Sequence, residues 1–154
     1  MITTTNSNFA ELNNNLISQT IQLYGAATIP NSGAGYFALN ASGNYNASLY
    51  EITDDGLMLK RAGRYLVHYH VVFPAASGAT TGVARIDLQK NKTDFSIIMR
   101  SIKSYHNFLS FSSAVEISAG VSIVSDNTTL NFRRSQNYVS SAPVDTFITV
   151  TRLP

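Results

Sequence analysis

The stretch that most constrains the fold is the run from Gly56 to Phe73, GLMLKRAGRYLVHYHVVF, the longest apolar, β-branched and aromatic segment of the chain. It divides at residues 60–63, where charged residues and a glycine interrupt the pattern, so it predicts two strands. Side chains alternate between the two faces of a strand. From Arg64 onward the odd positions all carry large side chains that could fill a core: Tyr65, Val67, Tyr69, Val71 and Phe73.

The even positions of the same segment are neither fully polar nor fully apolar: Leu66, His68, His70 and Val72. This pattern is typical of a strand that contacts something on both sides. The closing segment of the chain also carries apolar residues on both faces, with Phe147 on one face and Ile148 and Val150 on the other. We therefore expect both segments to be covered on two sides.

Shorter strand patterns recur along the rest of the chain, separated by turn residues such as Pro30-Asn31-Ser32-Gly33 and Asp126-Asn127. They recur about every 8 to 15 residues, and no helical pattern follows residue 25. This spacing predicts an all-β antiparallel sandwich or jelly roll. The strand candidates cover residues 20–24, 26–29, 36–39, 49–52, 56–59, 64–73, 83–90, 95–103, 108–119, 121–125, 129–134 and 146–153.

Residues 1–24 are expected to form a lead-in to a head domain over residues 25–154. Apolar residues and one glutamine recur in the lead-in at alternating spacings of three and four, as in a coiled-coil heptad: Phe9, Leu12, Leu16, Gln19 and Leu23. Two heptads are too short to be stable alone. The segment is therefore either a short helix or turn packed on the domain, leading into a first strand, or the end of a trimeric stalk.

Composition narrows the classes of partner. Charged residues make up only 13% of the chain and the net charge is +2, with the basic residues scattered, so we expect no nucleic-acid partner. No segment has the ~20 consecutive apolar residues of a membrane span, and the N-terminus lacks the pattern of a signal peptide. The absence of cysteine excludes disulfides, thiolate metal sites and cysteine nucleophiles.

The sequence contains no serine-nucleophile elbow, zinc-protease motif, phosphate loop or dinucleotide fingerprint.

His68 and His70 share a strand face, and three copies around an axis could form a metal-binding or pH-sensitive cluster. Hydrogen-bonded interface histidines explain the pair more simply. Asp54-Asp55-Gly56 is likewise explained by a turn rather than by calcium. We expect no enzymatic activity, no cofactor and no metal site.

The candidates for recognition lie near one predicted loop: Arg133, Arg134, Gln136, Asn137 and Tyr138. Guanidinium, amide and aromatic groups stack on and hydrogen-bond to sugars and protein surfaces. Tyr45 and Asn46 offer a second such group in the loop at residues 41–48. Each group is either a ligand-binding loop or an ordinary solvated loop.

Four short motifs occur in an order that resembles the globular head of the complement first component and the related tumour necrosis factor fold: LMLKRAGRYLVHYHVVF, IDLQKN, AVEISAGVSIV and DTFITVTRLP. The resemblance implies a trimer of jelly rolls, each of about ten strands. It places the following residues at the interface between copies: Leu66, His68, His70, Val72, Ile148 and Val150. Because Val121 stands where that family's motif carries Asp, no calcium ligand is carried over.

Together these expectations describe a non-enzymatic homotrimeric head that acts by binding. The expected location is a virion surface, in particular that of a bacteriophage. There the head is a spike or receptor-binding protein that contacts a host-surface glycan or protein, or a decoration protein on a capsid. One alternative is the C-terminal head of a bacterial collagen-like or spore-surface protein. A further alternative, from a different functional class, is a glycan-cleaving enzyme. Such an enzyme requires a pair of carboxylates in a cleft.

Overall fold

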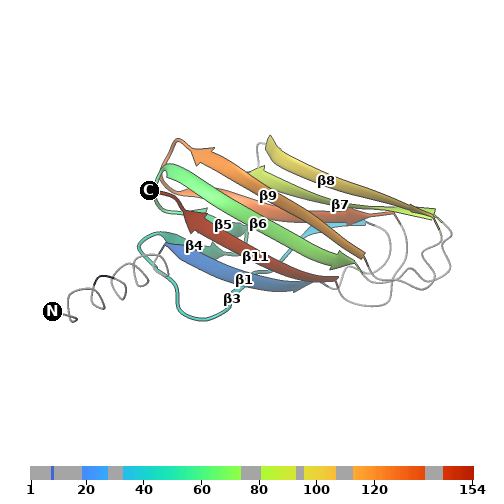
Figure 1. The fold of residues 1–154 in the computed structure, drawn as a ribbon, viewed down its shortest axis with the longest axis horizontal. Helices are drawn as coiled ribbons and strands as arrows, with labels where there is room; N and C mark the ends of the chain where they lie inside the picture. The colour runs from blue at the N-terminus through green and yellow to red at the C-terminus, as the bar shows by residue number, and fades with distance from the viewer. Residues whose placement is uncertain are drawn as a thin grey trace.

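The computed structural model describes residues 8, 19–27, 33–73, 81–92, 96–106, 113–137 and 144–154. These residues form two stacked antiparallel sheets (Figure 1). The strands are β1 (Thr20–Ala27), β2 (Gly33–Tyr36), β3 (Asn40–Ala41), β4 (Tyr50–Thr53), β5 (Gly56–Leu59), β6 (Gly63–Phe73), β7 (Thr81–Lys90), β8 (Ser96–His106), β9 (Ser113–Ile123), β10 (Thr128–Gln136) and β11 (Val144–Arg152). Within the described ranges, no helix has the length and apolarity to cross a membrane.

The first sheet has the strand order β3-β1-β11-β6-β9, and the second has the order β4-β5-β10-β7-β8. β2 pairs with the far end of β10, beyond the part that pairs with β5. From β8 onward each successive strand lies in the opposite sheet, which is the winding of a jelly roll. The predicted all-β jelly-roll fold is therefore confirmed.

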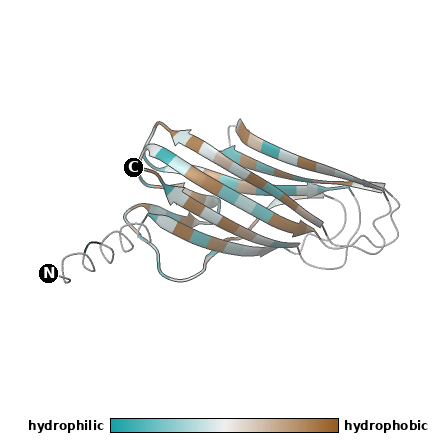
Figure 2. Cartoon of the chain, viewed as in Figure 1, coloured by the Kyte–Doolittle hydropathy of each residue, from teal (hydrophilic) through white to brown (hydrophobic). Residues whose placement is uncertain are grey.

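β6 supplies the centre of the core. Its odd positions are fully buried, as predicted, and hydropathy alternates along the strands of the first sheet (Figure 2). The ring of Tyr69 makes edge-to-face contacts with Phe37 and Phe132, at centroid distances of 6.3 and 5.2 Å. Its hydroxyl donates a hydrogen bond to the carbonyl of Arg133, 3.2 Å away. Burial raises the pKa of Tyr69 well above its usual value. Tyr69 thus links the two sheets through both its ring and its hydroxyl.

A second buried tyrosine joins β4 to the ends of the first and last strands. The hydroxyl of Tyr50 donates a hydrogen bond to the Gln19 carbonyl and accepts one from the Arg152 amide, 3.1 Å away. These backbone groups lie just before β1 and at the end of β11. Burial raises the pKa of Tyr50, so the hydroxyl stays protonated and able to donate.

Some strand boundaries differ from those expected. The break between β5 and β6 lies where it was predicted. The predicted break at Gly120 is wrong, because β9 runs through this residue and pairs it with Leu66. The predicted turn after Lys103 is also wrong, since β8 continues to His106. In both places pairing with a long neighbouring strand outweighs a weak local preference.

The N-terminal lead-in is described only in part. β1 confirms the strand expected at residues 20–24 and extends it to Ala27, across the predicted division between lead-in and head. The heptad-like residues Phe9, Leu12 and Leu16 lie outside the described residues, so a helix or stalk there stays a prediction.

Gly56 provides a test of how β5 packs against β10. Its φ is 143°, and a Cβ at this position would lie 2.3 Å from the carbonyl oxygen of Leu130. Gly56→Ala is therefore expected to lower the free energy of unfolding by roughly 3 kcal/mol, because strain and collision add. Chemical denaturation measures this loss. Gly43→Ala is the matched control, with a φ of 99° and nothing within 4 Å of the added Cβ. Equal losses in the two variants would show that the close approach to Leu130 is unimportant.

Candidate functional site

The outward side of the first sheet carries several large apolar side chains that one chain leaves exposed. Tyr24 is 51% exposed, Leu66 45%, Phe147 43% and Val72 37%. Phe147 of β11 pairs with Tyr24 of β1 and with His70 of β6, so these side chains form one row across the sheet. We name this surface the β6 face; it comprises Tyr24, Leu66, His68, His70, Val72 and Phe147.

Two of the predicted interface residues do not belong to the β6 face. Ile148 and Val150 are fully buried and pair with Tyr69 and Val67, whose side chains fill the core. Their assignment to an interface is therefore wrong, and the large apolar residue on the outward side of β11 is Phe147. The predicted outward position of Leu66, His68, His70 and Val72 agrees with the structure. That other copies cover these residues stays a prediction.

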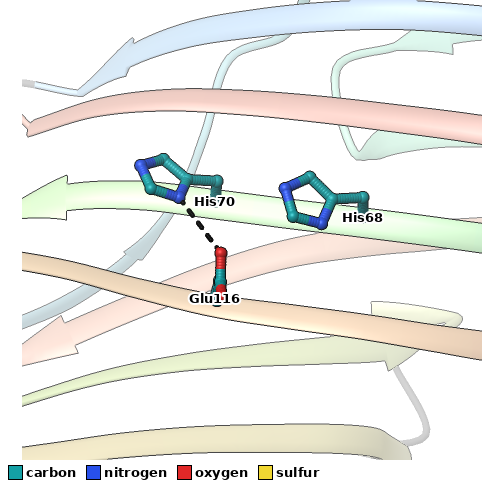
Figure 3. Close-up of side chains that lie close together, drawn as sticks. All are labelled: His68, His70 and Glu116. Carbon is teal, nitrogen blue, oxygen red and sulfur yellow. Dashed lines mark ion pairs between the residues drawn. The ribbon is translucent and has the colours of Figure 1, made fainter.

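Two histidines of the β6 face and a carboxylate of the neighbouring strand β9 form a cluster of groups that can ligate a metal (Figure 3). His68 and His70 project from the same side of β6, with nearly parallel rings 6.4 Å apart. Glu116 of β9 pairs directly with His70, and its Oε2 lies 3.6 Å from Nδ1 of that histidine. The sequence analysis missed Glu116, because the register between β6 and β9 cannot be derived from either strand alone. We name these three residues the histidine cluster.

The predicted recognition residues are not brought together at one loop. Arg134 and Gln136 lie in β10 and are buried between the sheets, where Nη1 of Arg134 donates to Oε1 of Gln136 at 2.7 Å. Their placement in a loop is wrong, because β10 continues to Gln136, and a ligand-binding role for them stays a prediction. Asn137 is exposed, and its Oδ1 accepts a hydrogen bond from the Val83 amide at 2.6 Å. Tyr138 lies outside the described residues.

Tyr45 and Asn46, the second predicted recognition group, have local structural roles. Tyr45 is partly buried and packs against the hydrophobic core. The Oδ1 atom of Asn46 accepts hydrogen bonds from the amide and hydroxyl of Ser48, at 3.0 and 2.6 Å. A ligand-binding role for Tyr45 and Asn46 stays a prediction.

The outward side of the second sheet carries a charge cluster that the sequence analysis missed. The carboxylate of Asp87 is only 1% exposed and is surrounded by three guanidinium groups. Its oxygens lie 2.7 Å from Nε of Arg100, 3.4 Å from Nε of Arg85 and 3.4 Å from Nη1 of Arg133. The hydrogen bond to Asp87 raises the pKa of Arg100. Asp87 lies on the outward face of its strand, but the arginines cover it. Three positive groups share one negative group, so the surface has an excess of positive charge.

An open groove of about 370 Å³ adjoins this arginine cluster. Arg85 belongs to both, and Asn137, one of the predicted recognition residues, lines the groove. The lining of the groove combines apolar and polar residues, a combination that suits a small ligand. The lining residues are Ala34, Val83, Arg85, Ile102, Ser135, Gln136 and Asn137.

No protein-family model and no curated protein matches the chain. Among solved structures the chain is similar to murine APRIL at pH 8.0, with 12% identity and a TM-score of 0.54 over 87% of this chain and 99% of that one. It is also similar to Eiger TNF from S. frugiperda, with 11% identity and a TM-score of 0.58 over 88% of this chain and 92% of that one. At this level of identity the likeness shows the fold, which is the tumour necrosis factor-like jelly roll that the sequence motifs implied.

Asp87→Asn tests the arginine cluster. Removing the shared negative charge leaves three neighbouring guanidinium groups that repel one another, so the melting temperature is expected to fall by several degrees. Glu51→Gln is the control, because Glu51 forms an ion pair with Lys60 at 2.9 Å but is half exposed. Exposed pairs contribute little to stability. Equal shifts in a thermal-unfolding experiment would show that the cluster is no stronger than an ordinary surface pair.

Proposed function

We propose that the protein is a non-enzymatic homotrimeric binding module in which each chain packs its β6 face against two other copies. The observation that carries this proposal is the set of large apolar side chains exposed on that face. A monomer would leave Tyr24, Leu66, Phe147 and Val72 in water, and exposed apolar side chains gathered on one face mark sites of protein association. A closed ring of identical copies covers the patch on every chain. The tumour necrosis factor-like fold supports the same arrangement.

We further propose that the groove beside the arginine cluster binds the ligand, and that the ligand is a glycan bearing a carboxylate. The excess positive charge around Asp87 favours an anionic group, and guanidinium groups bind carboxylates with two parallel hydrogen bonds. The apolar side chain of Ile102 and the amide of Asn137 can contact the sugar ring. The second sheet faces away from the β6 face, so the groove stays accessible in the trimer.

The location that fits this module is a virion surface, where a trimeric head acts as a spike or receptor-binding protein, or as a capsid decoration protein. The head of a bacterial collagen-like or spore-surface protein is the alternative. Both proposals rest on the low content of charged residues and on the stalk-like pattern of the lead-in. Immunogold labelling of intact particles and of cell surfaces distinguishes them.

Leu66→Asp tests the trimer. The wild-type protein is expected to have the mass of three chains by light scattering, and the variant the mass of one, because a buried carboxylate without a partner opposes association. Val124→Asp is the matched control, since Val124 is 82% exposed in the turn between β9 and β10. A wild-type mass of one chain at micromolar concentration would refute the trimer.

Arg85→Ala tests the groove. On a glycan array the wild-type protein is expected to prefer carboxylate-bearing glycans over their neutral counterparts. The variant should lose about tenfold or more in affinity, since a hydrogen bond between charged groups contributes ~1.5–3 kcal/mol. Arg61→Ala is the control, because Arg61 is exposed in the turn before β6, away from the groove. Equal binding of neutral glycans would contradict the proposed ligand, and tight binding to capsids instead would favour a decoration protein.

A further inference from the structure

Two imidazoles and a carboxylate meet on the β6 face within a single chain. One ligand atom from each of His68, His70 and Glu116 lies within 4.8 Å of the other two. We propose that the histidine cluster is a binding site for a divalent transition-metal ion, with Zn²⁺ as the preferred ion. No part of the proposed function requires such a site.

The donor set selects the class of metal. Imidazole nitrogen and carboxylate oxygen are ligands of Zn²⁺, and two histidines with one carboxylate form zinc sites that keep a fourth position open. Calcium takes six to eight oxygen ligands, more than these side chains provide. Magnesium also prefers oxygen ligands. The two imidazoles therefore favour zinc and its neighbours in the transition series.

The geometry is close to that of a bound ion. A tetrahedral Zn²⁺ with bonds of about 2.0–2.1 Å holds its ligand atoms about 3.3 Å apart. Nδ1 of His70 and Oε2 of Glu116 are already 3.6 Å apart. The longest separation within the cluster is 4.8 Å, so binding requires a movement of about 1.5 Å at most. Both histidines are half-buried and Glu116 is exposed, so rotation of side chains can supply that movement.

The backbone holds the three donors in place before the metal arrives. His68 and His70 are two residues apart on β6 and so lie on the same face. Pairing of β6 with β9 places Glu116 directly opposite His70. All three donors belong to one chain, so the site is complete without a second copy, and a water molecule can occupy the fourth position.

Titration of the intact protein with Zn²⁺ by calorimetry tests the inference. The wild-type protein is expected to bind one Zn²⁺ per chain. His68→Ala, His70→Ala and Glu116→Gln should each weaken binding by about tenfold or more. His106→Ala removes a histidine outside the cluster and should bind as the wild type does. Thermal unfolding without metal confirms that each variant is folded.

Substitution by Co²⁺ provides an independent measurement. The wild-type protein should show the intense visible absorption of four-coordinate Co²⁺, and His70→Ala should lose it. Equal affinity in the wild type and the three cluster variants would show an adventitious ion only and overturn the inference. One Zn²⁺ per two or three chains would also overturn it, because the ligands would then come from several copies. Light scattering on the same samples reports the trimer separately, so failure of the metal site and failure of the trimer are distinguishable.

Discussion

The alternation of side chains along β6 is the constraint on which the rest of the structure depends. Its odd residues are fully buried between the sheets, and its even residues face outward. A shift of one residue in the pairing with β11 and β9 would move every side chain to the opposite face. Tyr69 would then lie in water and His68 and His70 would enter the core, where unpaired polar groups are costly. The register that builds the core therefore also fixes which side chains form the β6 face.

The sequence predicted β6 correctly because one of its faces is uniformly large and apolar, so its orientation is unambiguous. β11 lacks this contrast: Phe147 is apolar on one face, and Ile148 and Val150 are apolar on the other. Only the pairing of Ile148 with Tyr69 decides which face is inward. Glu116 was missed for the same reason, because its meeting with His70 depends on the register between two strands that are far apart in the sequence.

Arg134 and Gln136 were misplaced because the strand was expected to end at residue 134, whereas β10 continues to Gln136. Arg134 and Gln136 continue the inward alternation of Leu130 and Phe132 along β10, and they are stabilised there by a mutual hydrogen bond. Asp87 is the opposite case, an outward-facing residue that is nonetheless buried. Its strand position faces outward, but the long arginine side chains beside it exclude water from the carboxylate. The burial of Asp87 depends on Arg100 and Arg133 of the two neighbouring strands, and the sequence of β7 alone does not contain that information.

The proposed metal site and the proposed trimer interface share one surface, so zinc binding and trimer assembly are coupled. Packing of copies against the β6 face removes water from His68, His70 and Glu116, and burying such groups without partners costs free energy. A bound Zn²⁺ supplies a partner for both imidazoles and neutralises the carboxylate, which lowers that cost. Any factor by which Zn²⁺ strengthens the trimer must equal the factor by which the trimer strengthens Zn²⁺ binding. In the proposed trimer the apolar side chains of the β6 face would provide the contact area for assembly, and a metal ion bound at the histidine cluster would add to the stability of that contact.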